Sequence, residues 1–197
     1  MKKLNIKKHL KNILSEKRYE HTIAVAETSV KLAKIYGEDI NKIEIAALLH
    51  DCAKNLKLSE MKRLIGRESE LTKVEYNLPE ILHGFAGAIY ARNIFKIEDK
   101  DILNAIKYHT IGRKNMTMIE KIIYIADVIE PGRKCGNVDK VRKLAYKDID
   151  CAILQEMKNK INYLLSTNRV IHTNTIDMRN SILLKKRNGK KDENISC

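Results

Sequence analysis

Residues 117–132 read TMIEKIIYIADVIEPG, a stretch that contains both ends of a helix together with its interior. Thr117 is a favourable N-cap, and Glu120 three residues later completes the pattern of a capping box. Pro131 ends the segment, because a proline cannot continue a helix. Between these ends the segment is apolar on nearly every side, which is typical of a helix that is buried all round. The stretch therefore predicts a buried helix over Met118–Ile129.

The rest of the chain shows the same kind of pattern, in which amphipathic segments follow one another between capping residues. Further helices are predicted at residues 16–36, 39–51, 59–66, 79–95, 99 or 101 to 108, 138–146, 149–165 and 175–186. Residues 66–77 and 110–115 are expected to be loops. No internal repeat, heptad series or alternating strand pattern is found. The sequence thus predicts an all-α protein, a single compact helical bundle.

The expected boundaries follow from the same reading. Residues 1–15 are an N-terminal helix or extension, residues 16–186 form the main domain, and residues 187–197 are a flexible basic tail. Hydrophobic residues make up 44% of the 197, which excludes disorder for most of the chain. Only 8 Gly and 2 Pro are present, too few for the frequent turns of a many-stranded sandwich.

The chain carries no signal for a membrane or for export. No apolar run is long enough to span a bilayer, and the basic N-terminus lacks the apolar segment of a signal peptide. We therefore expect a cytoplasmic protein without membrane contact. The four cysteines form no CxxC pair and fit no zinc-finger spacing, so they are expected to be free thiols in that compartment. They are Cys52, Cys135, Cys151 and Cys197.

The chain is strongly basic, with 38 Lys and Arg against 25 Asp and Glu and a formal net charge of +13. A basic surface attracts nucleic acid, anionic lipid or phosphate-rich substrates. The same excess also arises from a general bias toward Lys, Ile and Asn, in which case the lysines simply cover a solvated surface. The charge alone leaves these alternatives open.

Several polar residues lie where the sequence predicts burial. Asp127 interrupts the apolar run at 122–129, and a buried carboxylate needs a cation, hydrogen-bond donors or a metal. No basic residue lies one turn before or after Asp127, so its partner must come from another segment. His50 and Asp51 follow a second apolar run at 45–49. Three more histidines lie within or at the ends of other predicted helices: His21, His83 and His109.

These residues make a stronger pattern together than singly. A single His on an apolar helix is more often a satisfied core residue, and a buried Asp often forms a salt bridge. Imidazole and carboxylate ligands together suit Fe, Mn, Co, Ni or Zn better than Mg or Ca. A His-Asp pair after an apolar run, with further histidines and a late buried aspartate, therefore favours a metal site.

Five segments carry a family resemblance: RYEHT (18–22), LLHDCAK (48–54), LHGFAGA (82–88), YHTIGR (108–113) and EKIIYIAD (120–127). The segments IEPGR (129–133) and IHTNT (171–175) extend it. The chain resembles the HD superfamily of metal-dependent phosphohydrolases. More narrowly, it is similar to the YqeK-type branch, the symmetrical bis(5'-nucleosyl)-tetraphosphatases. The resemblance covers residues 16–184, with Phe85 and Thr173 departing from the residues usual in that branch.

The resemblance implies an HD-type helical bundle with a dinuclear metal site. The metal would be iron, with Mn, Co, Ni and Zn as alternatives. The implied ligands of one metal are His21, His50, Asp51 and Asp127, and those of the other are Asp51, His83 and His109. Asp51 and a hydroxide would bridge the two metals. The implied reaction is hydrolysis of diadenosine tetraphosphate at its central phosphoanhydride to give two ADP.

Cationic residues near the ligands suit phosphate binding. Lys54 follows Asp51 by three residues and returns to the same helix face, so these two are the predicted catalytic residues. Arginines next to the ligands can make bidentate phosphate contacts, with a plain surface position as the alternative for each. The predicted substrate contacts are Arg18, Lys54, Thr110, Arg113, Arg133, His172 and Thr175. Glu130 is a candidate to orient Arg133 or a ligand histidine.

Other functions stay open at this point. One is a different HD activity, such as a nucleotidase or phosphodiesterase, and another is oxygen activation at a di-iron site. A basic nucleic-acid-binding module with a structural metal site ranks last, because no nucleic-acid-binding motif is recognisable. The expected partner is a nucleotide substrate, nucleic acid is not expected, and a homodimer is left open.

Overall fold

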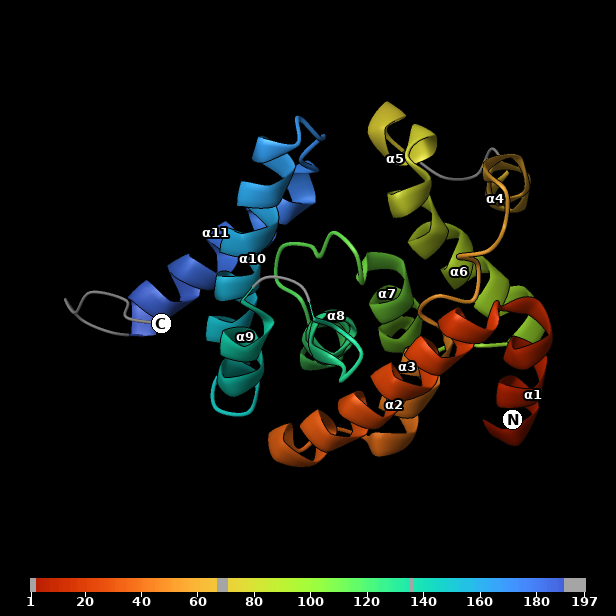
Figure 1. Cartoon of the computed structure of the whole chain (residues 1–197), viewed down its shortest axis with the longest axis horizontal. Coiled ribbons are helices and arrows are strands. Elements are labelled where there is room, and N and C mark those ends of the chain that lie inside the picture. Colours follow the sequence, from red (N-terminus) through yellow and green to blue (C-terminus); the bar gives the residue numbers. More distant parts are fainter. Residues whose placement is uncertain (1–2, 67–70, 135–136, 190–197) are drawn as a thin grey trace.

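The computed structural model describes residues 3–66, 71–134 and 137–189. This part of the chain forms eleven α-helices and contains no strand (Figure 1). The prediction of an all-α fold is confirmed.

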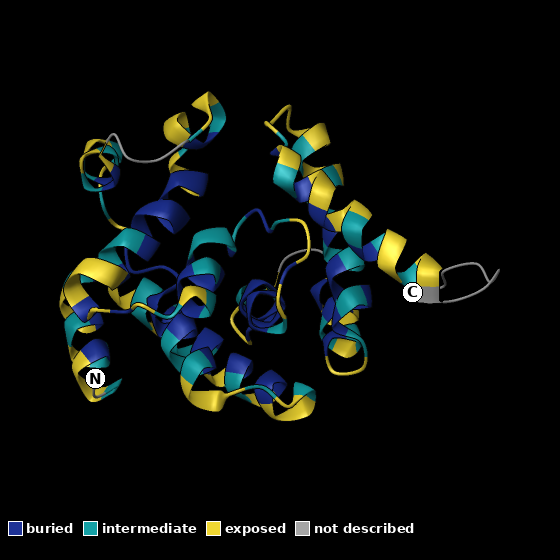
Figure 2. Cartoon of the chain, turned by 180° about the vertical axis from the view of Figure 1, so that it is seen from behind, coloured by how far each residue is buried: buried dark blue, intermediate teal, exposed yellow. Residues whose placement is uncertain are grey.

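Helix α8 (Met118–Ile129) lies at the centre of the bundle, where Figure 1 shows it nearly end-on. It packs against α2 (Glu16–Tyr36), α3 (Ile40–Leu49), α7 (Lys100–Tyr108) and α10 (Ile149–Ser166). Residues 122–126 are at most 1% exposed, which confirms the burial predicted from their apolar sequence. Figure 2 shows α8 as buried, whereas the outer sides of α2 and α11 carry exposed residues.

Side-chain caps fix the ends of the helices that supply the site. Thr117 Oγ1 accepts from the Glu120 N–H at 3.4 Å, and Glu120 Oε2 accepts from the Thr117 N–H at 2.7 Å, so the predicted capping box is formed. Asp39 and Asp99 cap α3 and α7. Gly37 ends α2 with φ at 73°, a left-handed conformation that glycine adopts without steric cost.

The remaining helices lie at the two ends of the chain and on one side of the bundle. They are α1 (Lys3–Ile13), α4 (Leu58–Ile65), α5 (Lys73–Asn77), α6 (Pro79–Phe95), α9 (Val138–Ala145) and α11 (Thr173–Gly189). The expectation of a loop throughout 66–77 was wrong, because Thr72 and Glu75 form a capping box that starts α5. Helix α11 continues past residue 186, and residues 190–197 lie outside the described part.

Helices α6 and α7 approach each other closely at Gly84. A Cβ atom at this position would lie 2.7 Å from the carbonyl oxygen of Lys107 and 3.3 Å from that of Ile106, so only glycine fits without a backbone shift. The contact lies one residue after His83 on α6 and two residues before His109 at the end of α7. This backbone approach brings the two histidines side by side.

The cysteines only partly follow the prediction. Cys52 is a buried free thiol. Cys151 is disulfide-bonded, so the prediction of a free thiol was wrong for it. The compartment argument behind that prediction does not address which thiols the fold brings into contact. Cys135 and Cys197 lie outside the described residues.

None of the described helices combines the length and the apolar character that crossing a bilayer would require.

Candidate metal centre and adjoining cavity

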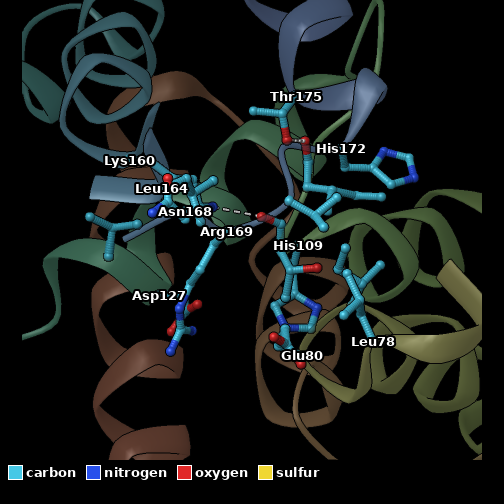
Figure 3. A pocket seen from close by; sticks show the side chains of 15 residues that line it. Leu78, Glu80, His109, Asp127, Lys160, Leu164, Asn168, Arg169, His172 and Thr175 are labelled. Carbon is cyan, nitrogen blue, oxygen red and sulfur yellow. Dashed lines mark hydrogen bonds between the residues drawn. The ribbon is translucent and has the colours of Figure 1, made fainter. Parts of the chain in front are cut away.

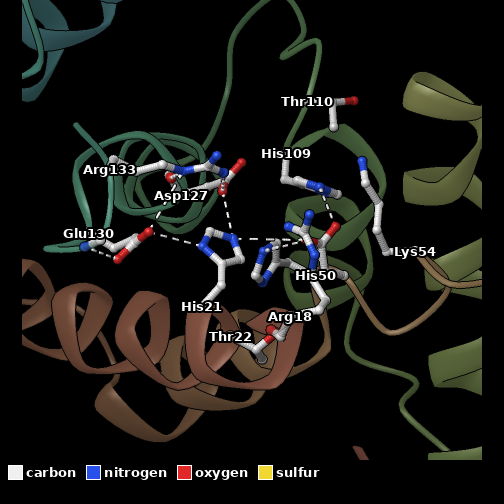
Figure 4. A network of polar contacts seen from close by, with 12 residues as sticks. Arg18, His21, Thr22, His50, Lys54, His109, Thr110, Asp127, Glu130 and Arg133 are labelled. Atoms are coloured by element: carbon white, nitrogen blue, oxygen red, sulfur yellow. Dashed lines mark hydrogen bonds and ion pairs between the residues drawn. The ribbon is translucent and has the colours of Figure 1, made fainter. Parts of the chain in front are cut away.

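The six predicted ligands come together from five parts of the helical framework. His21 lies on α2, His50 and Asp51 follow the end of α3, and Asp127 lies on α8. His83 lies on α6, and His109 follows the end of α7. Figure 4 shows His21, His50, His109 and Asp127 turned toward one another between their helices.

Asp51 lies at the middle of this cluster, with its two carboxylate oxygens facing different histidines. Its Oδ1 lies 3.1 Å from Nε2 of His83 and 3.6 Å from Nε2 of His109. Its Oδ2 lies 3.5 Å from Nε2 of His50 and 3.9 Å from Nε2 of His21. Asp51 is only 3% exposed, so these imidazoles and its cationic neighbours replace water around it.

The second carboxylate and two arginines complete the cluster. Asp127 Oδ1 lies 3.0 Å from Nε2 of His21 and accepts from the Arg133 guanidinium at 2.6 Å. Arg18 donates to Asp51 Oδ2 at 2.7 Å. Each carboxylate therefore has one arginine as a counter-charge.

All four imidazoles are held by their Nδ1 atoms. The acceptors are Glu130 Oε1 for His21 at 3.1 Å, Ala47 O for His50 at 2.6 Å, Pro79 O for His83 at 3.1 Å and Ile106 O for His109 at 2.7 Å. A proton on Nδ1 leaves Nε2 with a lone pair. Each Nε2 lies within 3.9 Å of Asp51, and that of His21 also lies 3.0 Å from Asp127. Histidines that bind metals are held in this way by an acceptor on the other ring nitrogen.

Two of these nitrogens are left without a hydrogen-bond partner. Nε2 of His21 and Nε2 of His50 are buried and unsatisfied among the described residues. A further pair of ring nitrogens, Nε2 of His83 and Nε2 of His109, lies only 3.0 Å apart. Buried acceptors without donors are costly, and a bound cation would satisfy them.

The ionisation states of the histidines and aspartates in the cluster are suited to binding a cation. Burial lowers the pKa of His50 to about 4, although the Asp51 charge works in the opposite direction. Burial likewise lowers the pKa of His83. Burial works to raise the pKa of Asp127, but the His21 ring, His50 and Arg133 hold it well below its ordinary value. At neutral pH His50 and His83 are therefore neutral and Asp127 is ionised, as metal binding requires.

The geometry fits a divalent metal. Ligand atoms of His21, His50 and Asp127 lie within 4.8 Å of one another, and so do those of His50, Asp51 and His109. Nitrogen and carboxylate donors in this proportion are those of Fe, Mn, Co, Ni and Zn sites. In the second group His50 appears where the resemblance implied His83, so the division of ligands between two ions stays a prediction.

A cavity of about 420 Å³ opens directly beside the cluster, with His109 and Asp127 in its wall (Figure 3). Three predicted substrate contacts also line it: Thr110, His172 and Thr175. The hydroxyl oxygen of Thr110 is buried and has no hydrogen-bond partner. The Thr175 hydroxyl instead donates to Ile111 O at 3.1 Å, and the His172 ring pairs with Glu75 at 3.1 Å.

The segment that carries this cluster matches a known protein family. A profile of the HD domain matches residues 18–132, a segment that includes all six residues of the cluster. The chain belongs to the HD domain family.

Similar HD proteins cover nearly the whole chain. A protein of Halalkalibacterium halodurans named a symmetrical bis(5'-nucleosyl)-tetraphosphatase is 44% identical over 174 residues, covering 88% of this chain and 93% of that protein. A Bacillus subtilis protein of the same name is 43% identical, covering 84% and 89%. A crystal structure of a Clostridium acetobutylicum protein described as a predicted HD superfamily hydrolase involved in NAD metabolism superposes with a TM-score of 0.91. It is 42% identical and covers 94% of this chain and 98% of its own.

Of the four cationic residues predicted to bind substrate, three lie at the cluster and one lies away from it. Arg18 and Arg133 contact the two carboxylates, and Lys54 Nζ lies 3.4 Å from both ring nitrogens of His83. Arg113 lies elsewhere. Its guanidinium donates to both oxygens of Glu120, at 2.6 and 2.9 Å, and lines a separate cavity of about 200 Å³.

Sequence reasoning missed two cations in the cavity wall, Lys160 and Arg169. Lys160 follows Glu156 by four residues on an amphipathic helix, a spacing that normally indicates a solvated ion pair. Arg169 lies in the connection between α10 and α11, where no motif marks it. Lys160 and Arg169 line the cavity only because α10 packs beside α8. By contrast, Glu130 was identified as a residue that could orient a ligand, and its carboxylate accepts from His21.

Proposed function

We propose that the protein is a metal-dependent hydrolase that splits diadenosine tetraphosphate at its central phosphoanhydride to give two ADP. The observation that carries the proposal is the cluster itself, in which four imidazoles and two carboxylates come together beside a cavity of about 420 Å³ that His109 and Asp127 help to line. Proteins of the same family with this activity in their names match almost the full chain.

The metal is proposed to be iron in a dinuclear site, with Asp51 as the shared ligand. The support is that the two oxygens of Asp51 face different imidazoles, His83 and His109 on one side and His50 and His21 on the other. A bound pair of metals supplies Lewis acidity and lowers the pKa of water, which makes a protein nucleophile unnecessary.

The protein's own side chains are proposed to hold the polyphosphate. Arg18 and Arg133 are guanidinium donors beside the carboxylates, and Lys54 brings an ammonium group over the His83 ring. Charge-assisted hydrogen bonds from such donors are about twice as strong as neutral ones. The unpartnered Thr110 hydroxyl adds a neutral donor inside the cavity. Arg113 drops out of this set, since Glu120 already holds both edges of its guanidinium.

The deciding experiment is turnover of diadenosine tetraphosphate by protein reconstituted with Fe²⁺ or Mn²⁺, with the products identified by chromatography. We expect ADP as the sole product and a loss of at least 1,000-fold in the Asp51→Ala variant, roughly the scale of losing a metal-centred catalyst. Asp139→Asn, at an exposed carboxylate, is the matched control and should behave as wild type. AMP together with ATP would contradict central cleavage, and no turnover with any metal would redirect the search to other phosphate substrates.

A further inference from the structure

The wall of the cavity formed by α10 and the α10–α11 connection carries two cations that the proposed metal chemistry does not use. They are Lys160 on α10 and Arg169 in the connection (Figure 3). The residues between and around them are largely apolar, including Leu164 and Val170. Two positive charges in a largely apolar wall of the cavity that also contains Asp127 indicate that this wall meets an anion.

Two hydrogen bonds hold the Lys160 ammonium group in place, and its third N–H is available as a donor. Its Nζ donates to Thr110 O at 2.7 Å and to Tyr124 Oη at 3.3 Å. An ammonium has three donors, so one remains for a ligand. Burial works to lower the pKa of Lys160, but Tyr124 and Glu156 raise it above its ordinary value. The side chain therefore stays charged at neutral pH.

Arg169 is presented by a defined turn and has no ion-pair partner among the described residues. Asn168 adopts a left-handed conformation with φ at 50°, which asparagine tolerates better than most residues. The Arg169 N–H then donates to Leu164 O at 2.8 Å, which fixes the start of the side chain. In Figure 3 the Arg169 side chain extends from this turn toward Asp127.

We infer that Lys160 and Arg169 form a phosphate-binding pair, which holds the phosphates of the nucleoside diphosphate half that occupies this cavity. The inference rests on the proposed function and adds to it a second set of cations, in the cavity wall and not beside His83, where Lys54 lies. The two residues are positioning residues, because they fix the nucleotide relative to the metal cluster and take no part in bond cleavage. Their effect should therefore appear in KM for the substrate and in the affinity for ADP.

The test compares Lys160→Met and Arg169→Gln with wild type. For each variant we expect KM for diadenosine tetraphosphate and the inhibition constant of ADP to rise about tenfold, the loss of one charge-assisted hydrogen bond. The value of kcat should stay within about threefold. The conservative variants Lys160→Arg and Arg169→Lys should recover part of the affinity. Inhibition by adenosine, which lacks phosphates, should not change.

The matched controls are Lys158→Met and Arg179→Gln, at exposed cations on α10 and α11 that line a different cavity. Both controls should match wild type. Arg169 is exposed, so its replacement keeps the fold intact and the test valid even if Lys160→Met lowers the melting temperature. An unchanged KM and ADP inhibition in Arg169→Gln would overturn the inference. So would an equal loss of adenosine inhibition, which would move the contact from the phosphates to the nucleoside.

The phosphate-binding pair can be tested even if the proposed reaction is not observed. If wild type does not hydrolyse diadenosine tetraphosphate, the dissociation constant of ADP is measured by calorimetry on the metal-loaded protein. A tenfold weaker binding in the two variants would then still support the phosphate-binding pair without the proposed reaction. Equal binding in wild type and variants, or no binding to wild type, would overturn the pair.

Discussion

Glu130 links the cluster of histidines and aspartates to the turn that follows α8. Its Oε1 accepts from His21 Nδ1 at 3.1 Å, and its Oε2 accepts from the Gly132 N–H. The carboxylate is 4% exposed, so both contacts are made away from water. One side chain thus sets the tautomer and orientation of His21, and it positions the chain segment that carries Arg133.

Replacing Glu130 should weaken metal binding without removing a ligand. We expect Glu130→Gln to lower metal affinity by roughly 10–100-fold, since a neutral amide oxygen holds the His21 N–H less strongly than a carboxylate. Competition with a chromophoric chelator measures the affinity. Glu98→Gln, at a glutamate on the surface, serves as the control. Unaltered affinity in Glu130→Gln would show that the charge of Glu130 does not support metal binding through His21.

The low pKa of His50 predicts how the metal-free protein responds to acid. Its pKa is about 4 in the folded protein against 6.5 ordinarily, so the unfolded chain takes up a proton at higher pH than the folded one. The free energy of unfolding should therefore fall as the pH drops from 6.5 to 4, by about 3 kcal/mol for this group. Urea unfolding of chelator-treated protein at pH 7, 5.5 and 4.5 measures the slope. The slope should be shallower in His50→Asn, and equal slopes would contradict the assignment.

Helix α8 both fills the core of the bundle and positions Asp127, and different residues of its sequence do each. Its interior residues are buried in the bundle, and its N-terminal capping box fixes where it begins. Asp127 lies in the last turns, so the start of the helix sets the rotation at which the carboxylate meets His21. Glu120 adds a further contact, since the same carboxylate that caps the helix also holds Arg113.

Loss of the α8 cap should cost stability. We expect Thr117→Ala to lower the free energy of unfolding by about 1 kcal/mol, because the Glu120 N–H loses its acceptor. In a domain of this size that corresponds to a melting temperature lower by about 2–4 °C. Thr167→Ala, at an exposed threonine at the end of α10, is the comparison. A loss that is no greater in Thr117→Ala than in Thr167→Ala would show that the cap contributes little.

Helix positions were largely predictable because caps and periodicity are local. Thr117 and Glu120, three residues apart, mark the start of α8, and Asp39 marks the start of α3. Helix α5 was missed although Thr72 and Glu75 form the same motif, since the polar sequence around it gave no periodic signal.

The candidate site divides in the same way. The six clustered residues could be picked out because most of them are polar residues in or beside an apolar run, a signal visible along the chain; that they bind metal stays a prediction. Lys160 and Arg169 belong to the cavity only through the packing of α10 and the turn after it. The contact of Arg113 with Glu120 likewise depends on where the loop after His109 folds back. The bonding of Cys151 requires a second thiol brought near it by the tertiary structure, which the spacing of cysteines along the chain does not show.

For the whole molecule, the cluster connects segments that lie far apart in the sequence. Its residues span positions 21 to 127 and come from α2, α6, α8 and the ends of α3 and α7. An ion that binds them holds five helices together at one point. In the unfolded chain the same residues are scattered, so the ion binds the folded state.

Metal removal should therefore destabilise the whole fold. Metal at about 1,000 times its dissociation constant adds about 4 kcal/mol to the free energy of unfolding, so chelation should lower the melting temperature by about 8–16 °C. Scanning calorimetry of the metal-loaded and chelator-treated protein measures the difference. It should shrink sharply in Asp51→Asn. A wild-type melting temperature that does not respond to metal would mean that the cluster binds none.

The close approach at Gly84 has a consequence for how the protein can diverge. Because the backbones of α6 and α7 touch there, the spacing of His83 and His109 is set by main-chain contact, which no change of side chain elsewhere can adjust. Part of the cavity wall, by contrast, consists of side chains such as Leu164 and Arg169, on α10 and the turn after it, which do not share this contact. Evolution can therefore exchange these wall residues one at a time while the spacing of His83 and His109 is kept, so the cavity can change its shape and charge without a change in the cluster.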